Sequence, residues 1–227
     1  MLPFLHLLSS TCGQKAGAKA EVLILDRLSI KWLTKLRIIG LSGSGRVGGN
    51  TDTILNEALA AAKQEEAEIE MIRLFDHKLA PCNGCGVCRT TKNCVIDDDG
   101  EKLYQKILKS EGVILGCPSY FQGVTGQMKS FIDRVGYLSL ARGRKDFIGK
   151  VGGVIGVARR SGVTNVCSQM MNFVTATGMI VSSGGRVFVV AREKGDVLKD
   201  QEGLDTARNL GKMMVKIIVA TEGLRKV

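Results

Sequence analysis

The sequence predicts an α/β fold in which five parallel strands form an open, doubly wound sheet that carries an inserted cysteine-rich loop. From Leu36 onward, short apolar runs alternate with segments of helical periodicity, which is the pattern of a parallel sheet covered by helices. A loop rich in glycine and serine follows the first apolar run, at the position where such sheets bind phosphate. Four cysteines lie within the thirteen residues from Cys82 to Cys94, which predicts a site for a metal or an iron–sulfur cluster.

The strands are expected where apolar runs of strand length are bounded by turn residues. These runs are residues 36–41, 68–74, 112–117, 150–157 and, for the fifth strand, either 179–182 or 186–190. Helices are expected between and after them, over residues 50–63, 101–110, 125–139, 164–177 and 205–219, where apolar side chains recur at helical spacing. Asn50 or Thr51 is a suitable N-cap for the first helix, and the acidic residues before Glu101 favour the start of the second.

The length of 227 residues fits one ordinary domain with a tail. Residues 1–35 are therefore expected to be an N-terminal extension, and residues 36–227 the domain. Hydrophobic residues make up 44% of the chain and charged residues 24%, as in ordinary globular proteins. No apolar run reaches the roughly 18 residues that a membrane helix needs. The sequence thus predicts no membrane span and a cytoplasmic location.

The N-terminal residues carry only weak signals. Residues 2–8 are apolar and faintly resemble a leader, but no basic residue precedes them. Residues 20–32 are compatible with a short strand and helix. We expect an extension that adds little to function. Cys12, Cys117 and Cys167, outside the cysteine run, are expected to be ordinary thiols.

The first candidate site is the loop that follows the first strand, residues 42–51. Its glycines allow backbone N–H groups to approach an anion, and the following helix contributes the positive end of its dipole. Ser42, Ser44 and Thr51 offer hydroxyl groups, while Asn50 offers an amide and Arg46 a charge. The match to Gly-x-Gly-x-x-Gly is weak by itself, and the hydroxyl groups favour the phosphate of a mononucleotide. The alternative is a glycine-rich turn without a ligand.

The second candidate site is the cysteine run, with Cys82, Cys85, Cys88 and Cys94 spaced by two, two and five residues. Thiolates are soft ligands, no histidine interrupts the run, and adjacent glycines allow the backbone to fold tightly. A [4Fe–4S] cluster is the favoured interpretation. A structural zinc ion and a redox disulfide are the alternatives that the sequence leaves open.

Two further loops are expected at the same edge of the sheet. Residues 118–123 follow the third strand, where Tyr120 and Phe121 offer flat faces to a ring system. Residues 158–162 follow the fourth strand and would reach the same crevice. The alternatives are an aromatic pair that closes the core and a solvated basic turn.

These motifs occur in the order typical of one family. The phosphate loop, the cysteine run with residues 95–99, residues 118–121 and residues 129–134 together resemble the iron–sulfur flavoproteins, which belong to the NAD(P)H-dependent FMN reductase group of flavodoxin-like proteins. The resemblance covers roughly residues 36–220, in the size range of one domain. Gly45 departs from it, since the family commonly has proline there, and residues 1–35 have no counterpart.

The resemblance implies a flavodoxin-like fold, FMN, one [4Fe–4S] cluster per subunit and a homodimer or homotetramer. It further implies that electrons pass from ferredoxin to the flavin through the cluster, with no catalytic acid or base of the protein's own. The implied cluster ligands are Cys82, Cys85, Cys88 and Cys94. The implied phosphate ligands are Ser42, Ser44, Arg46, Asn50 and Thr51. The implied ring-binding residues are Pro118, Ser119, Tyr120, Phe121 and Gly123, with Arg160, Ser161 and Gly162 as a looser match.

The charge of the chain bears on its partners. The net charge is +10, and six basic residues face one acid, Asp146, between Leu140 and Arg160. These basic residues are Arg142, Arg144, Lys145, Lys150, Arg159 and Arg160. An acidic electron donor or an anionic cofactor fits this charge better than nucleic acid, for which no recognition motif is present. An NAD(P)H-dependent flavin or quinone reductase, whose cysteines hold zinc or nothing, and a non-enzymatic electron carrier remain the rival functions.

Overall fold

The computed structural model describes residues 36–226, and within them it contains the predicted five-stranded parallel sheet. The strands are β1 (Arg37–Ser42), β2 (Glu68–Arg73), β3 (Gly112–Pro118), β4 (Val151–Ala158) and β5 (Ile180–Val190). Their order across the sheet is β2-β1-β3-β4-β5, and every neighbouring pair is parallel. This order is that of a flavodoxin-like sheet, so the predicted fold class is confirmed.

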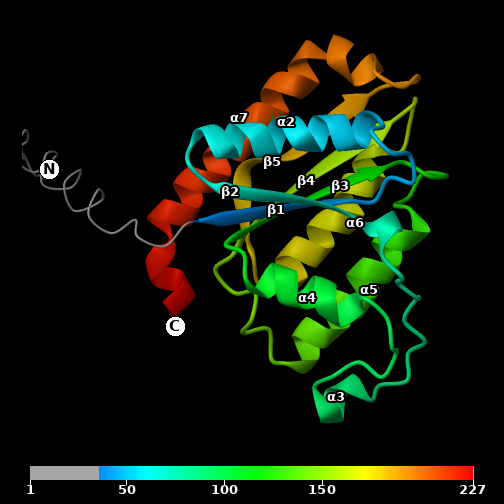
Figure 1. The fold of residues 1–227 in the computed structure, drawn as a ribbon, viewed down its shortest axis with the longest axis vertical. Coiled ribbons are helices and arrows are strands. Elements are labelled where there is room, and N and C mark those ends of the chain that lie inside the picture. The colour runs from blue at the N-terminus through cyan, green and yellow to red at the C-terminus, as the bar shows by residue number, and fades with distance from the viewer. Residues whose placement is uncertain (1–35, 227) are drawn as a thin grey trace, which may run out of the picture. The chain divides into compact units, whose positions relative to one another are not determined.

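Helices cover both faces of the sheet (Figure 1). They are α2 (Asn50–Gln64), α3 (Cys88–Thr91), α4 (Gly100–Leu108), α5 (Gly126–Ala141), α6 (Val163–Ala176) and α7 (Gln201–Ala220). Short 3-10 segments occupy Leu74–Asp76, Asp196–Lys199 and Glu222–Lys226. α2 and α7 pack on one face, while α4, α5 and α6 pack on the other. None of the described helices is long and apolar enough to cross a membrane.

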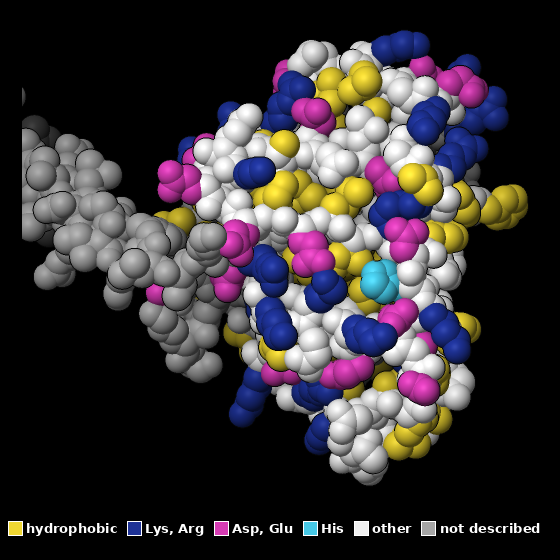
Figure 2. Space-filling model, viewed as in Figure 1, with side chains coloured by type: hydrophobic (Ala, Val, Ile, Leu, Met, Phe, Trp, Pro, Cys, Tyr) yellow, Lys and Arg dark blue, Asp and Glu magenta, His cyan; other side chains and the backbone are white. Residues whose placement is uncertain are grey.

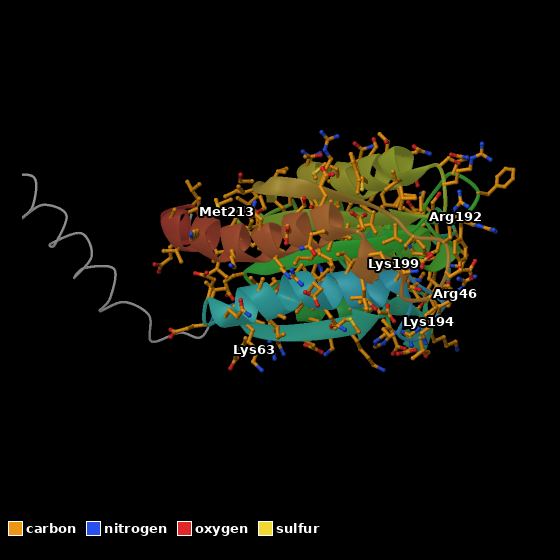
Figure 3. All side chains as sticks on the ribbon, turned by 90° about the horizontal axis from the view of Figure 1, so that it is seen from above. Arg46, Lys63, Arg192, Lys194, Lys199 and Met213 are labelled. Atoms are coloured by element: carbon orange, nitrogen blue, oxygen red, sulfur yellow. The ribbon has the colours of Figure 1, made fainter. Side chains whose placement is uncertain are left out.

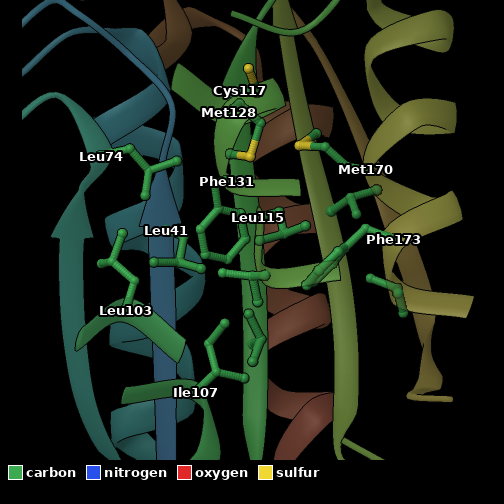
Figure 4. Close-up of a cluster of buried hydrophobic side chains, with 14 of the residues drawn as sticks. Leu41, Leu74, Leu103, Ile107, Leu115, Cys117, Met128, Phe131, Met170 and Phe173 are labelled. Atoms are coloured by element: carbon green, nitrogen blue, oxygen red, sulfur yellow. The ribbon is translucent and has the colours of Figure 1, made fainter. Parts of the chain in front are cut away.

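Two hydrophobic cores lie on the two faces of the sheet. Figure 4 shows the larger part of one of them, where Phe131 from α5 and Phe173 from α6 pack over Leu115 of β3. On the opposite face, a Cβ atom at Gly211 of α7 would lie 2.0 Å from the carbonyl oxygen of Ala58 in α2. Only glycine therefore allows these two helices to approach so closely.

Three local predictions need correction. The N-cap of α2 is Gly49 rather than Asn50 or Thr51, because Asn50 already has helical geometry. The fifth strand is continuous and includes both predicted segments, with an irregularity in its pairing between Gly152 and Val154 of β4. A short helix, α3, forms inside the cysteine run, where none was expected. The expectations for residues 1–35, including the free thiol of Cys12, lie outside the described residues.

Candidate functional site

The loops that follow the strands meet at the carboxyl edge of the sheet. Arg46, Arg192 and Lys194 lie together at this edge, at the opposite end of the sheet from Lys63 and Met213 (Figure 3). Arg46 comes from the loop after β1, while Arg192 and Lys194 follow β5. Cationic side chains from distant parts of the chain thus gather where parallel sheets bind anionic ligands.

The phosphate loop is braced from beneath by a buried carboxylate. Asp52, in the first turn of α2, is 2% exposed; it accepts hydrogen bonds from Ser42 Oγ at 2.5 Å and from the backbone N–H of Gly48 at 2.9 Å. The Nε atom of Arg73 lies 3.2 Å from Asp52 Oδ2, so the two side chains form an ion pair. Arg73 also donates to the carbonyl of Ser44 at 3.3 Å. Both the inner end and the far end of the loop are therefore fixed before any ligand binds.

A cavity of about 280 Å³ opens above this loop. Its lining residues come from the ends of β1, β3, β4 and β5 and are Ser44, Arg46, Gly49, Asn50, Thr51, Pro118, Ser119, Tyr120, Val157, Ala158, Arg159, Ala191, Arg192 and Glu193. Its lining includes three arginines but a single carboxylate, that of Glu193, so the cavity suits an anion.

The cavity contains only part of the predicted flavin site. Ser44, Arg46, Asn50, Thr51, Pro118, Ser119 and Tyr120 line it. Ser42 is fully buried, and its hydroxyl is bound to Asp52. The side chain of Asn50 joins the loop after β5, because it donates to the carbonyl of Glu193 and accepts from the N–H of Gly195, both at 2.8 Å. Phe121, Gly123, Arg160, Ser161 and Gly162 are absent from the lining.

The segment after β3 is a tight, strained turn. Tyr120 and Gly123 exchange backbone hydrogen bonds of 2.9 and 3.1 Å, while Phe121 and Gln122 between them have φ angles of 44° and 70°. Such left-handed angles usually require glycine or asparagine, so the turn stores strain. Phe121 lies at the tip of this turn, and its side chain is fully exposed.

Contacts from the start of α6 hold this turn in place. Asn165 donates to the carbonyl of Gln122 at 2.7 Å, and Gln122 donates to Ser161 Oγ at 3.0 Å. A Cβ atom at Gly162 would lie 2.4 Å from Ser119 Oγ, so glycine is required where the two loops touch. Ser161 and Gly162 thus support the turn after β3.

Sequence reasoning missed three residues of this edge: Asp52, Arg192 and Glu193. Arg159 was expected at the crevice with residues 158–162 but was not among the predicted cofactor ligands, although it lines the cavity. Asp52 could have been predicted as a residue that fixes the phosphate loop, because it lies in the first turn of the helix that follows this loop. Nothing in the sequence placed the loop after β5 at the cavity.

The cysteine run lines a second cavity, of about 520 Å³. All four cysteines, Cys82, Cys85, Cys88 and Cys94, are among its lining residues, with Arg134, Tyr137, Leu138, Leu140 and Ala141 of α5 as one wall. Gly84 and Gly86 both have positive φ angles, 71° and 74°, and no atom lies within 4 Å of a Cβ placed on either. Among the described residues, however, no group of three or more cysteine, histidine or acidic side chains is arranged to hold a metal ion. The thiols share a cavity but do not yet converge.

A buried ion pair closes the base of the cysteine loop. Arg134 of α5 pairs with both oxygens of Asp98 at 2.8 and 2.9 Å, and these side chains are 3% and 1% exposed. Asp98 accepts from the N–H groups of Ala80 and Gly100, each at 2.8 Å, so it joins the two ends of the loop. Burial alone would raise the pKa of Asp98, but the hydrogen bonds from Arg134, Ala80 and Gly100 lower it below its ordinary value.

A second arginine, at the C-cap of α5, holds the far part of the loop. Arg142 donates to the carbonyl of Lys92 at 2.9 Å and to Asn93 Oδ1 at 3.0 Å, pairs with Glu101, and stacks on Tyr104 with its guanidinium 4.4 Å from the ring centre. Arg142 is thus engaged internally.

The predicted basic segment is therefore smaller than the sequence suggested. Lys150 is 8% exposed and donates to the carbonyls of Leu108 and Ser110. Arg144, Lys145, Arg159 and Arg160 remain exposed. On the face drawn in Figure 2, basic side chains are interspersed with acidic ones instead of forming one patch.

Cys117 and Cys167, the two described cysteines outside the run, are buried. Burial raises the pKa of Cys117 to about 11 and that of Cys167 to about 12. Both therefore stay protonated and unreactive near neutral pH.

The residues present fit both implied cofactors. The first cavity offers hydroxyls, backbone N–H groups and arginines to a phosphate, and the second offers four sulfur ligands with no competing histidine. The open surroundings of Gly84 and Gly86 leave the backbone room to adjust around a cluster.

The fold and the anion-binding edge are those of a flavodoxin-like α/β protein. Similar solved structures include RosB with a bound 8-demethyl-8-formylriboflavin-5'-phosphate (TM-score 0.65, 15% identity, covering 83% of this chain and 81% of that chain). A flavodoxin from the domain Archaea has a TM-score of 0.56 at 13% identity, covering 81% of this chain and 99% of that chain. At such identities these structures support the fold alone.

Sequence comparisons give the family. The NADPH-dependent FMN reductase family model matches residues 36–193. An iron–sulfur flavoprotein of Methanocaldococcus jannaschii is 37% identical over 193 residues, which are 81% of this chain and 97% of the relative. One from Methanosarcina thermophila is 33% identical over 184 residues, 77% of this chain and 93% of the relative. The chain belongs to the iron–sulfur flavoprotein family.

Proposed function

We propose that this chain binds FMN and one [4Fe–4S] cluster and passes electrons from a low-potential donor such as ferredoxin, through the cluster and FMN, to an acceptor. The observation that carries the proposal is that Cys82, Cys85, Cys88 and Cys94 line one cavity in which no histidine or acidic side chain competes. The family supports the coarser statement, an FMN-dependent electron-transfer oxidoreductase.

Residues at the carboxyl edge of the sheet would hold the FMN phosphate. Ser44, Arg46 and Thr51 line the cavity with donors, and Asn50 at its rim ties the loop after β5 to the phosphate loop. Ser42 acts from beneath, through Asp52, on the shape of the loop. We add Arg159 and Arg192 to the predicted set, because both line the same cavity.

The turn after β3 would hold the ring of the flavin. Pro118, Ser119 and Tyr120 lie at the cavity, and Phe121 and Gly123 complete the strained turn beside it. Ser161 and Gly162 fix that turn, and the neighbouring Arg160 is exposed to solvent at the same edge.

When bound, the cluster exchanges single electrons and the flavin exchanges one or two. The protein's part is to position the two groups and to set their potentials by hydrogen bonds, charge and exclusion of water. We therefore assign no catalytic acid or base to this chain.

The partners follow from surface charge and family. An acidic donor such as ferredoxin would meet the exposed Arg144, Lys145, Arg159 and Arg160, since complementary charge speeds encounter. A homodimer or homotetramer in the cytoplasm, without nucleic acid or membrane partners, completes the proposal.

Anaerobic purification tests the proposal directly. We expect about four irons and one FMN per chain, from the composition of a [4Fe–4S] flavoprotein. Cys85→Ala should lose iron, keep FMN and lose reduction of the flavin by ferredoxin, while dithionite still reduces it. Cys167→Ala, a matched change of a buried thiol outside the cavity, should keep iron. Stoichiometric zinc without iron after anaerobic reconstitution would overturn the proposal.

An NAD(P)H-dependent FMN or quinone reductase with a zinc-filled or vacant cysteine site is the second candidate. It is favoured by the description of the matching family model and by the absence of a converged metal site among the described residues. Rapid bleaching of the flavin by NADPH, unaffected by Cys85→Ala, would support it.

A further inference from the structure

Arg134 lies in the wall of the cysteine cavity and is buried. Both of its terminal nitrogens are fully used. Nη1 donates to Asp98 Oδ2 at 2.8 Å and to the carbonyl of Ala80 at 3.1 Å, while Nη2 donates to Asp98 Oδ1 at 2.9 Å and to the carbonyl of Ile96 at 3.4 Å. The remaining donor, Nε–H, has no hydrogen-bond partner among the described residues.

An unpaired buried donor is rare in native proteins and calls for an explanation. Two other buried polar atoms share this property in the part of the chain that the structure describes, Arg73 Nε and Ser139 Oγ. Arg73 Nε lies 3.2 Å from a carboxylate oxygen of Asp52 and so has a charged neighbour. Ser139 is absent from the lining of the cysteine cavity. Arg134 alone of the three combines an unused donor with a place in that cavity.

Four cysteine sulfurs are among the acceptors that line the cavity. Cys82, Cys85, Cys88 and Cys94 line the same cavity as Arg134. Sulfur accepts hydrogen bonds far better as a thiolate, the form in which cysteine binds iron, than as a thiol. The donor is thus placed for a partner that improves when the cluster is assembled.

We propose that Arg134 is a positioning residue of the iron–sulfur site, whose Nη pair locks both ends of the cysteine loop and whose Nε–H is kept for a cysteine sulfur of this cavity. The inference rests on the proposed function, because it requires an iron–sulfur cluster in this cavity. It assigns the cluster a hydrogen-bond donor that comes from α5 and not from the cysteine loop itself.

The consequence is a change in reduction potential. Hydrogen bonds to cluster sulfurs stabilise the reduced, more negative state and so raise the potential. Arg142, at the C-cap of the same helix, provides a matched control, because it holds the same loop through Lys92 and Asn93 but is not among the residues lining the cysteine cavity.

The experiment compares Arg134→Lys, Arg134→Gln and Arg142→Lys in the reconstituted full chain. Redox titration followed by electron paramagnetic resonance gives the potential of the cluster. Hydrogen exchange of residues 82–95 in the cluster-free protein reports how firmly the loop is held. Exchange should rise in all three variants, since both arginines hold the loop. The potential should move to more negative values in both Arg134 variants, further in Arg134→Gln, and stay at the wild-type value in Arg142→Lys.

Each outcome decides one question. Equal potentials in Arg134→Lys and the wild type would overturn the assignment of Nε–H, because lysine keeps the charge but lacks that donor. An equal shift in Arg142→Lys would assign the effect to loop looseness and also overturn it. If an Arg134 variant fails to retain iron, the hydrogen-exchange arm still tests the lock. Wild-type protein without iron would mean that the proposed function itself has failed.

Discussion

The phosphate loop and the cysteine loop are each fixed by one buried aspartate–arginine pair, but at different points. Asp52 and Arg73 brace the phosphate loop from within, because Asp52 binds the N–H of Gly48 inside the loop. Asp98 and Arg134 instead bind the residues that flank the cysteine loop, at Ala80 and Gly100. The first loop is therefore shaped before its ligand arrives. The second has fixed ends, while its four thiols line a cavity without converging.

The largest effect should follow from Asp98→Ala. This change leaves the buried charge of Arg134 unpaired, and we expect the free energy of unfolding to fall by about 3 to 5 kcal/mol. Chemical denaturation measures it. Asp97→Ala, at an exposed neighbouring position, should change stability by less than about 0.5 kcal/mol. Similar losses in both variants would mean that the pair does not fix the base of the loop.

Asp52→Asn tests the corresponding pair in the phosphate loop. The amide keeps the size of the side chain but cannot accept from Ser42, Gly48 and Arg73 alike, so we expect a loss of about 2 kcal/mol in stability. FMN binding, followed by quenching of flavin fluorescence, should weaken in parallel. Asp76→Asn is the control, because Asp76 contacts the same Arg73 at 3.4 Å from a side chain that is 60% exposed. An unchanged FMN affinity in Asp52→Asn would separate the brace from ligand binding.

Arg46→Ala should weaken FMN binding without affecting the fold. Arg46 is exposed at the cavity, and Asp52 shapes the loop independently of it. We expect about a tenfold loss of affinity, or about 1.4 kcal/mol, with an unchanged denaturation midpoint. Lys63→Ala removes a positive charge at the opposite end of the sheet and should leave the affinity unchanged. A tenfold loss in both would indicate an effect of net charge alone.

The pH dependence of stability offers the finest comparison. Because the folded-state pKa of Asp98 lies below the unfolded value of about 3.9, its stabilisation is complete above about pH 5. That stabilisation is lost as the pH falls through the lowered pKa. Wild type should therefore lose more stability than Asp98→Asn between pH 5 and the onset of acid unfolding, as thermal melts would measure. Parallel curves of stability against pH for the two proteins would contradict a lowered pKa of Asp98.

Much of the fold could be predicted from the sequence because it depends on local patterns. Apolar runs gave all five strands within one or two residues, except that β5 joins two segments that were predicted as alternatives. The interruption that separated them, Gly184 and Gly185, coincides with an irregular pairing and not with the end of a strand. Pattern alone does not distinguish a bulge from a break.

The site was harder to predict because its side chains form hydrogen bonds and ion pairs with residues that are distant in the sequence. The spacing of Cys82 to Cys94 predicted a shared cavity, and Ser44, Arg46 and Thr51 line the other one. The roles of Arg134 and Arg142 depend on residues 36 to 54 positions away, so charge counting misplaced Arg142 in a surface patch. The position of Arg192 beside the phosphate loop likewise depends on the order of strands in the sheet.

The attachment of the cysteine loop also affects how the protein withstands damage. Of its four cysteines only Cys88 packs, and then partly, against the core, so neither hydrophobic layer depends on what the loop carries. A cluster held there, as we propose, would be lost and replaced without disturbing the packing of the sheet or of its anion-binding edge. The pair at the base keeps the two ends of the loop in place through such a cycle. Replacing a lost cluster would then require no refolding of the domain.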